Sequence, residues 1–418
     1  MLARGYESRK LTDKVFSTAK RAKEAIAKYG DENVVNATIG SLYDENGKLA
    51  VLKTVMDVYH SLPDEEIANY ASSFTGDENY KKSVLISVFG DDYEEFLDGH
   101  YSSVIATPGG TGAVSNTIKN YMNMGDKALL PEWLWSPYIL MVKEKEGFVE
   151  YYPLFDDDGN IDIKTLGKKI FKLAETQENV VVVINDPCQN PTGSRLTIDE
   201  WKELKEIVTN ASKRANIILI IDIAYTDFDT RTPEEKRAVF ELLKNFPEEV
   251  LVVFAFSISK ALTSYGLRVG AQIALSKSKG VIEEFDTANS FSCRSTWSNI
   301  PRGGMKLFST IMLDKELRNR LEEERGYFKK LLDKRAELFL KEADECGLEV
   351  LPYKSGFFLT IPTYEYTSAV EKLLEKNNIF TVVLSKGVRI ALCSVPLSKI
   401  KGLAGRIKNI IEESKKIK

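Results

Sequence analysis

Six consecutive apolar residues at positions 251–256 constrain the fold more than any other stretch of this chain. Strands that are buried on both faces, as in the parallel sheets of α/β proteins, have continuous apolar sequences of this kind. Similar or shorter runs, separated by segments with helical spacing, occur at residues 104–106, 128–131, 180–184 and 217–221, and another at 271–275 is interrupted only by Gln272. The pattern predicts an α/β fold with a mainly parallel central sheet.

Polar residues directly follow the run at 251–256. Ser257 comes directly after the run. Lys260 is the first ionisable residue that follows, and Arg268 is the next charged residue. Ligands of parallel sheets bind at the carboxyl ends of the strands. Burial beside apolar walls lowers the proton affinity of a lysine, so Lys260 is a candidate amine nucleophile for a carbonyl group. Taken alone, a lysine at such a position is more often a surface lysine just beyond a strand, and the other polar strand ends decide against that reading of Lys260.

Two other strand ends carry side chains that suit ligand binding. Asp222 follows the aliphatic run 217–221 and precedes Tyr225, and a buried carboxylate there is costly unless a cation pairs with it. A helix N-cap is the alternative for Asp222. Asn190 opens an Asn-Pro-Thr-Gly turn, which leaves its amide as a donor for a ligand oxygen.

A glycine-rich segment at residues 107–113 contains Gly110 and Thr111 and leads into a helix that we predict from Val114. Free backbone N–H groups at the start of a helix, with a hydroxyl among them, can hold a phosphate, although a tight turn explains the glycines as well. Trp133 and Trp135 follow another predicted strand. Either ring could stack on a flat ligand, or both could pack against a neighbouring domain.

Composition excludes several classes of function. Hydrophobic residues at 43% and charged residues at 28% are typical of a soluble globular protein, and a net charge of −4 gives no electrostatic footprint for nucleic acid. No apolar run reaches the roughly 18 residues of a membrane span, and the N-terminal segment lacks an apolar signal core, so we expect a cytoplasmic protein. Four scattered cysteines and two histidines predict neither disulfides nor a metal site, so acid–base chemistry must use Lys, Tyr, Asp or Glu.

The length of 418 residues favours two domains. We expect a large domain over residues 53–310. Residues 1–52, which include an N-terminal arm with a helix at 12–29, would join residues 311–418 in a small domain. Because Gly30 follows the helical pattern, we expect the helix to stop there.

Two arginines stand out in the C-terminal half of the chain. Arg389 lies in an otherwise apolar strand pattern at 388–392, where an inward-pointing arginine would need a carboxylate and an outward one would be solvated. Arg294 lies in a polar stretch, residues 289–304, that we expect to be irregular.

Together, the strand ends offer an amine, a carboxylate, a phosphate cradle and an aromatic ring, which is the set that pyridoxal phosphate (PLP) uses. On four motifs the chain resembles the fold type I, class I aminotransferases, and most closely their aspartate and aromatic aminotransferase branch. The motifs are Gly-Gly-Thr-Gly-Ala at 109–113, Asn-Pro-Thr-Gly at 190–193, Asp-x-x-Tyr at 222–225, and Ser-x-x-Lys with a later Arg at 257–268. The resemblance extends from Gly40 to Arg389.

This resemblance implies a three-layer PLP-transferase fold, with a mainly parallel sheet in the large domain, together with a small α+β domain. It implies PLP as the cofactor and transamination between an amino acid, either aspartate or an aromatic one, and a 2-oxo acid such as 2-oxoglutarate. It also implies a homodimer whose active sites are shared across the interface. Small molecules, namely amino acids and 2-oxo acids, are the expected partners, rather than nucleic acid or a membrane.

The resemblance also assigns roles to single residues. Lys260 would form the internal aldimine and carry the proton between the substrate Cα and the cofactor, while Asp222 would pair with the pyridine nitrogen. Tyr225 and Asn190 would donate to the phenolic oxygen. The remaining roles are phosphate binding by Ser257, Arg268, Gly110, Thr111 and, from the other subunit, Tyr70; ring stacking by Trp135; and substrate binding by Gly40, Arg389 and, from the other subunit, Arg294.

The chain departs from the family pattern at the substrate end. Trp297 and Ile300 replace a Tyr and a Pro in the segment that begins at Arg294. Aromatic aminotransferases of this branch keep the same arginine, so Arg294 does not separate aspartate from aromatic substrates. Where aspartate aminotransferases often have a His behind the ring-binding Asp, this chain offers Tyr138.

Two alternatives to a transaminase share parts of this pattern. A PLP-dependent lyase or decarboxylase on the same scaffold would need the same cofactor residues. A transaminase differs in that glutamate converts its cofactor to the pyridoxamine form, seen by absorbance, and releases 2-oxoglutarate. A regulatory protein that senses the cofactor would be a binding module instead. Such proteins carry an appended helix-turn-helix segment, for which the residues before Gly40 offer no room.

Overall fold

The computed structural model describes residues 14–416, and these residues pack into two compact units. The large unit comprises Ala50–Leu331 and Pro352–Gly356. The small unit comprises the described residues up to Leu49 together with Leu332–Leu351 and those from Phe357 onward. The domain boundaries expected at residues 53 and 310 stay a prediction.

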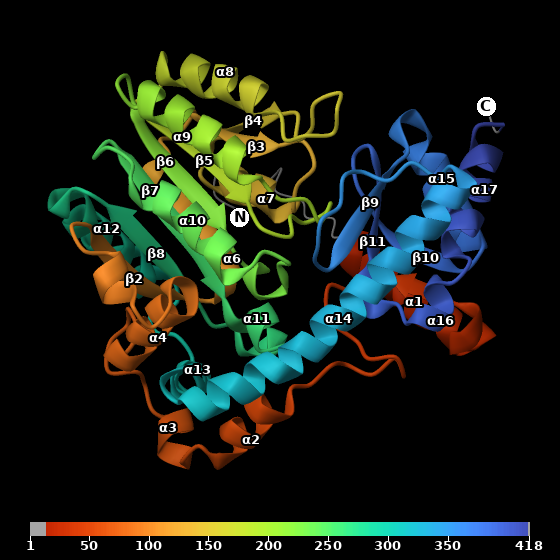
Figure 1. The fold of residues 1–418 in the computed structure, drawn as a ribbon, viewed down its shortest axis with the longest axis horizontal. Coiled ribbons are helices and arrows are strands. Elements are labelled where there is room, and N and C mark those ends of the chain that lie inside the picture. The colour runs from red at the N-terminus through yellow and green to blue at the C-terminus, as the bar shows by residue number, and fades with distance from the viewer. Residues whose placement is uncertain (1–13, 417–418) are drawn as a thin grey trace, which may run out of the picture. The chain divides into compact units, whose positions relative to one another are not determined.

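Within the described residues, the large unit is built around a seven-stranded sheet of order β2-β8-β7-β6-β5-β3-β4 (Figure 1). The strands are β2 (Tyr101–Thr107), β3 (Lys127–Pro131), β4 (Phe148–Tyr152), β5 (Asn179–Asn185), β6 (Asn216–Asp222), β7 (Val250–Ser257) and β8 (Gly270–Ser276). Only β8 runs antiparallel to its neighbours among these paired strands. The predicted mainly parallel sheet is therefore confirmed, although strand β4 was not foreseen.

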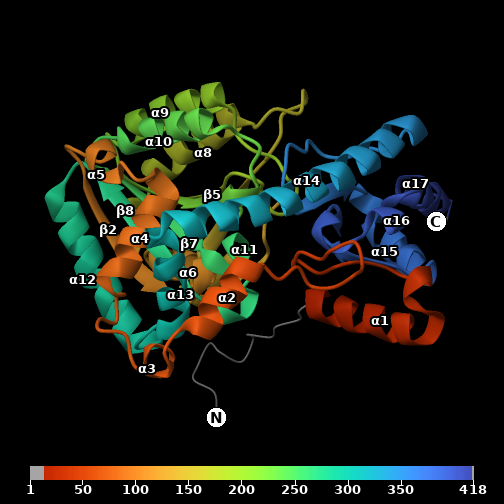
Figure 2. The same ribbon diagram turned by 60° about the horizontal axis from the view of Figure 1, so that its bottom comes forward.

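Helices cover both faces of this sheet. Figures 1 and 2 show α8, α9 and α10 side by side over one face, and α6, α7 and α12 pack against the other. The α-helices of the large unit are α2 (Lys53–Ser61), α3 (Asp64–Ala68), α4 (Glu78–Phe89), α5 (Tyr93–Phe96), α6 (Gly109–Tyr121), α7 (Pro137–Glu144), α8 (Ile163–Ala174), α9 (Ile198–Ala211), α10 (Pro233–Lys244), α11 (Ile258–Ala261), α12 (Lys279–Thr296), α13 (Arg302–Leu313) and the N-terminal part of α14 (Lys315–Cys346).

Strand β7 explains the apolar run at 251–256. Its side chains alternate between the two faces: Val253 packs in a cluster with Phe285 of α12, whereas the Phe254 ring lies 5.6 Å from that of Phe240 in α10. Every residue of β7 is buried. Because neither face meets water, neither face needs a polar residue, and the strand is apolar up to its last residue, Ser257.

Two helices differ from the prediction. Helix α6 begins at Gly109 rather than at Val114, so the glycine-rich segment forms its first turn and not a loop ahead of it. A Cβ on Gly112 would lie 2.4 Å from Cδ of Pro108, which is why the turn needs a glycine there. Helix α12 continues to Thr296 and α13 begins at Arg302, so the expectation that residues 289–304 are irregular is wrong except over residues 297–301.

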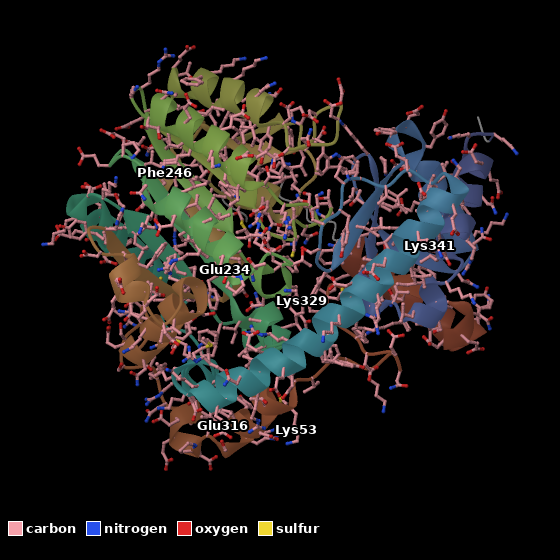
Figure 3. The ribbon with its side chains drawn as sticks, in the orientation of Figure 1. Lys53, Glu234, Phe246, Glu316, Lys329 and Lys341 are labelled. Carbon is pink, nitrogen blue, oxygen red and sulfur yellow. The ribbon has the colours of Figure 1, made fainter. Side chains whose placement is uncertain are left out.

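The small unit contains a four-stranded sheet of order β1-β10-β11-β9 within the described residues. Its elements are α1 (Lys14–Tyr29), β1 (Val35–Ala37), the C-terminal part of α14 (Lys315–Cys346), β9 (Phe358–Pro362), α15 (Thr367–Lys376), β10 (Ile379–Val383), β11 (Gly387–Ala391), α16 (Leu397–Ile400) and α17 (Leu403–Ser414). Figure 3 labels two exposed residues of α14, Glu316 and Lys341. Residues 12–13 of the helix predicted at 12–29 lie outside the described residues; the described part, α1, ends before Gly30, whose φ is +85°.

The predicted fold class is thus confirmed as a three-layer α/β large unit with a mainly parallel sheet, accompanied by a small α+β unit. Across residues 14–416, no helix is long and apolar enough to cross a bilayer.

Candidate active site

The carboxyl ends of three neighbouring strands bring the predicted catalytic residues of the large unit to one edge. Asn185 of β5 is in register with Asp222 of β6, and Asp222 is in register with Ala255 of β7. Lys260 lies in the short helix α11 that directly follows β7. Parallel pairing of β6 with β7 therefore places the carboxylate and the amine at the same edge of the sheet.

Asp222 is buried and held by two donors. The Tyr138 hydroxyl donates to its Oδ2 over 2.5 Å, and the backbone N–H of Ala224 donates to its Oδ1 over 3.1 Å. Burial raises the pKa of the Asp222 carboxyl, while the Tyr138 hydrogen bond and the nearby Lys260 charge act in the opposite direction. Burial and the Asp222 charge raise the pKa of Tyr138 well above its usual value, so Tyr138 stays protonated and donates.

Lys260 lies between two aromatic rings. Its Nζ is 4.8 Å from the ring centroid of Tyr265 and 5.6 Å from that of Tyr225. The side chain is half-buried. An ammonium group between ring faces is stabilised by their quadrupoles, and the rings also limit the directions that the amine can take. Tyr225, which was predicted to contact the ligand, thus lies beside Lys260.

The start of α6 meets the segment around Ser257 and Arg268. Nη1 of Arg268 donates to Ser259 Oγ over 3.2 Å. A Cβ on Gly109 would lie 2.7 Å from Nη2 of Arg268, and one on Gly110 would lie 3.6 Å from Cβ of Ser257. These glycines let the backbone N–H groups of a helix start come close to a guanidinium and two hydroxyls, which is an arrangement that binds a dianion.

The two tryptophans have different surroundings. Trp133 is buried in the core, and its carbonyl accepts a hydrogen bond from Gln189. Trp135 is half-buried, and its ring meets that of Tyr138 edge-on with centroids 5.3 Å apart. Because Tyr138 bonds Asp222, Trp135 has an accessible ring next to the carboxylate, and this favours Trp135 over Trp133 for stacking on a ligand.

Asn185 is a site residue that the sequence analysis missed. Its Nδ2 donates to the carbonyl of Asp222 over 2.8 Å, and its Oδ1 accepts from the backbone N–H of Asn190 over 2.8 Å. Asn185 thus fixes Asn190 relative to Asp222. The signal was a polar residue that ends a wholly apolar strand pattern, as Asp222 does one strand along.

Arg294 and Tyr70, both predicted to act across a subunit interface, have exposed side chains. Arg294 lies in the last turn of α12 and donates to Ser298 Oγ over 2.7 Å. The carbonyl of Tyr70 accepts a hydrogen bond from Arg302 over 3.0 Å. Their roles toward a partner subunit stay predictions.

Arg389 and Gly40, the predicted substrate-binding residues of the small unit, lie against one ring. The Arg389 guanidinium carbon is 4.1 Å from the ring centroid of Phe358, and its Nη2 donates to the carbonyl of Thr38 over 3.2 Å. A Cβ on Gly40 would lie 3.3 Å from Cζ of the same Phe358. Arg389 is buried, which a guanidinium accepts only where acceptors surround it.

Comparison with known proteins decides the family. The family model "Aminotransferase class I and II" matches residues 32–407 of this chain. The chain belongs to this family. It is an aminotransferase that depends on PLP, as its motifs predicted.

Three relatives illustrate the range of this aminotransferase family. A solved aminotransferase from Anaerococcus prevotii is 34% identical, with a TM-score of 0.93 and 98% of each chain covered. The mitochondrial aspartate aminotransferase of Gallus gallus is 22% identical over 93% of this chain and 90% of its own length. The fold is also that of a solved aromatic-amino-acid aminotransferase from Burkholderia pseudomallei, described as covalently bound to pyridoxal phosphate, with 21% identity, a TM-score of 0.78, and 98% of this chain and all of that chain covered.

The residues of the large unit fit PLP. The glycines at the start of α6 bring its backbone close to Arg268 and Ser257, where a phosphate would bind; Lys260 would offer an amine to the aldehyde, and Asp222 would offer a carboxylate to the ring nitrogen. Among residues 14–416, no group of three or more His, Cys, Asp and Glu side chains is arranged to hold a metal ion.

The Tyr138 hydrogen bond gives a testable pH dependence. In Tyr138→Phe, Asp222 loses a donor, so its pKa rises further and its ionised fraction at a given acid pH falls. A hydrogen bond to a charged group contributes about 1.5 kcal/mol or more, so we expect a loss of roughly tenfold in kcat/KM at acid pH. The acid limb of the pH profile should move to higher pH.

Tyr152→Phe is the matched control for this pH prediction. Tyr152 is buried, but its hydroxyl faces the carbonyl of Val183 rather than Asp222. An unchanged acid limb in Tyr138→Phe, or an equal change in the control, would contradict the assignment.

Proposed function

We propose that this aminotransferase moves the amino group between an amino acid with an acidic or aromatic side chain and a 2-oxo acid such as 2-oxoglutarate. The observation that carries the proposal is that the Lys260 amine and the buried Asp222 carboxylate follow adjacent strands at the same edge of one sheet. One relative named as an aspartate aminotransferase and another named as an aromatic-amino-acid aminotransferase support this substrate range. A homodimer and a cytoplasmic location are part of the proposal.

When bound, PLP supplies an aldehyde that condenses with amines and a protonated ring that accepts electron density from the substrate Cα. Lys260 Nζ is then the base that takes the proton from the substrate Cα. Asp222 keeps the ring nitrogen protonated, because its carboxylate is buried and oriented by Tyr138 and Ala224. Tyr225 and Asn190 would donate to the phenolic oxygen of the ring.

The remaining residues of the proposed PLP site would bind the cofactor without taking part in proton transfer. Arg268 and Ser257, with the backbone N–H groups of Gly110 and Thr111, would bind the phosphate as a charge-assisted set of hydrogen bonds. Trp135 would stack on the ring, and Tyr70 of a second subunit would reach the phosphate.

Substrate recognition would depend on two arginines. Arg389 would bind the α-carboxylate as a bidentate pair near the Gly40 backbone, since a guanidinium fork matches a carboxylate. Arg294 of a second subunit would bind the side-chain carboxylate of an acidic substrate. A charge pair in a closed site contributes strongly to specificity, because the charge left after removal of one partner is buried without compensation.

An amino-donor panel with 2-oxoglutarate tests this proposal. Wild type should release product from glutamate and from aspartate or an aromatic amino acid. In Arg294→Ala, kcat/KM for dicarboxylic donors should fall by roughly 30-fold or more, equivalent to about 2 kcal/mol, whereas aromatic donors are spared. Lys279→Ala, which removes an exposed cation from the same helix, is the control.

Mixed dimers separate the two possible origins of Arg294. A dimer of one Lys260→Ala chain and one Arg294→Ala chain holds one complete site only if Arg294 is donated by the other subunit. Recovery of dicarboxylate activity on mixing supports that arrangement. A uniform loss across all donors in Arg294→Ala, or none, contradicts the proposed substrate range.

A further inference from the structure

A fully buried arginine lies in the small unit. Arg335 of α14 has no exposed surface, which is rare for a charged side chain. A guanidinium has five N–H groups, and five hydrogen bonds are recorded for Arg335. Its Nε and Nη2 donate to Glu45 Oε1 over 3.0 and 2.6 Å, its Nη2 also donates to the carbonyl of Tyr43 over 2.9 Å, and its Nη1 donates to the carbonyls of Leu392 and Cys393 over 3.2 and 3.1 Å.

These bonds join two separate segments of the small unit. One is the segment with Tyr43 and Glu45, and the other is the 3₁₀ turn Leu392–Ser394 that follows β11. The backbone joins the same segments, since the N–H of Tyr43 donates to the carbonyl of Cys393 over 2.8 Å. Glu45 extends the link, because its Oε2 accepts from the N–H of Leu397 over 2.9 Å.

Each joined segment carries one of the two proposed substrate-binding residues. Gly40 precedes Tyr43 in the first segment, and Arg389 of β11 precedes the turn in the second. Arg389 and Gly40 flank the Phe358 ring, and Arg389 also donates to the carbonyl of Thr38. A change in the distance between the segments would therefore change the place of Gly40 relative to the Arg389 guanidinium.

We propose that the Arg335–Glu45 ion pair is a positioning device, which fixes the Gly40 segment against Arg389 and thereby sets the affinity for the substrate α-carboxylate. The inference rests on the proposed function of Arg389. The pair does not touch substrate itself. Because Arg335 is buried, loss of the Glu45 charge leaves its cation without a counter-charge, and the segments must shift to let water or other acceptors reach it.

Glu45→Gln is the main test, since Glu45 is about one-third exposed and the change preserves its shape. We expect KM for both the amino acid and the 2-oxo acid to rise roughly tenfold or more, because a small displacement of a positioned group is costly. The value of kcat should change little, which is the mark of lost binding shared by ground and transition states. The dissociation constant of PLP should stay at the wild-type value, because the proposed PLP residues belong to the large unit.

Arg335→Lys supports the test from the other partner, since lysine keeps the charge but cannot supply the fork of five donors. Arg21→Gln is the control: Arg21 pairs with Glu375 in the same small unit, and both side chains are partly exposed. Titration calorimetry of each holoenzyme with 2-oxoglutarate measures the dissociation constant directly, and this measurement does not depend on turnover.

The outcomes are distinct. A KM in Glu45→Gln equal to that of the Arg21→Gln control overturns the inference, and so does an equal loss of PLP affinity, substrate affinity and melting temperature, which would indicate a purely structural pair. Arg389→Lys tests the underlying function: if it raises KM while Glu45→Gln does not, the proposed function stands and the inference fails. If Arg335→Lys does not fold, Glu45→Gln decides alone.

Discussion

Lys260→Ala is expected to lower kcat by at least about 10⁴-fold with every amino donor. Alanine removes both the amine that condenses with an aldehyde and the base that takes the Cα proton, and a positioned base alone contributes up to roughly 10⁴-fold. The variant should still fold, because the Lys260 side chain is half-buried and lies between rings rather than in the core. It should also bind PLP, but without a covalent bond.

Borohydride reduction followed by peptide mass spectrometry measures that covalent bond. In wild type, reduction should fix PLP to the peptide that contains Lys260, and in Lys260→Ala no peptide should carry it. Lys244→Ala is the matched control, because Lys244 is also largely buried in the large unit and lies 4.2 Å from the Phe96 ring centroid. Turnover within tenfold of wild type in Lys260→Ala, or PLP fixed to another lysine, would refute the assignment.

The central strands of the sheet could be predicted because both of their faces are buried. Strand β4, at one of the two edges, could not, because its Phe148 is exposed and its Glu150 is bonded to Lys127 and Lys169. Its sequence therefore lacks both a continuous apolar run and a clear alternation. Such a strand can be recognised only from its pairing with a neighbouring strand, which the sequence does not reveal.

The end of α12 was missed for a different reason. Its buried face is polar: the Oδ1 of Asn289 accepts from Asn116 and Asn120 of α6, and Ser292 donates to Asn120. A search for apolar residues at helical spacing finds no stripe in such a segment. Buried side-chain amides satisfy one another here, and their partners lie far away in the sequence.

Residues in and around the candidate site also differ in how far the sequence could predict them. Residues at strand ends, such as Asp222 and Lys260, could be predicted because polar residues that follow an apolar run are conspicuous. Arg335 could not, because it lies in a helix rich in charged residues, where the sequence gives no sign that this one arginine is buried. Its proposed role rests on the acceptors that other segments bring to it.

Asp222→Asn is expected to lower kcat by roughly 10²- to 10⁴-fold, which corresponds to the 3–5 kcal/mol typical of a broken buried charge pair. An amide cannot hold the ring nitrogen protonated, so the base Lys260 would act on a less acidic Cα–H. The Tyr138 hydroxyl can still donate to the amide oxygen, so the local packing should persist.

The same change should stabilise the protein when PLP is absent. Burial raises the folded-state pKa of Asp222 above its unfolded value, so the folded protein favours the neutral carboxyl. The stability that this group contributes is complete below the unfolded pKa and is lost as pH rises through the folded pKa. At neutral pH, where the carboxyl is ionised in the unfolded chain, the burial of Asp222 therefore costs the PLP-free enzyme stability, and asparagine removes that cost.

The role of the Asp222 carboxylate is thus tested by two effects of Asp222→Asn, a gain in stability without PLP and a loss of turnover with PLP. Calorimetry of PLP-free protein at neutral pH should give a higher melting temperature for Asp222→Asn than for wild type, while kinetics with PLP should show the loss of turnover. Asp199→Asn, which neutralises an exposed carboxylate beside Lys202, should change neither. A lower melting temperature together with wild-type turnover would mean that Asp222 serves only to hold Tyr138 and the end of β6 in place, and the pairing with the ring nitrogen would have to be abandoned.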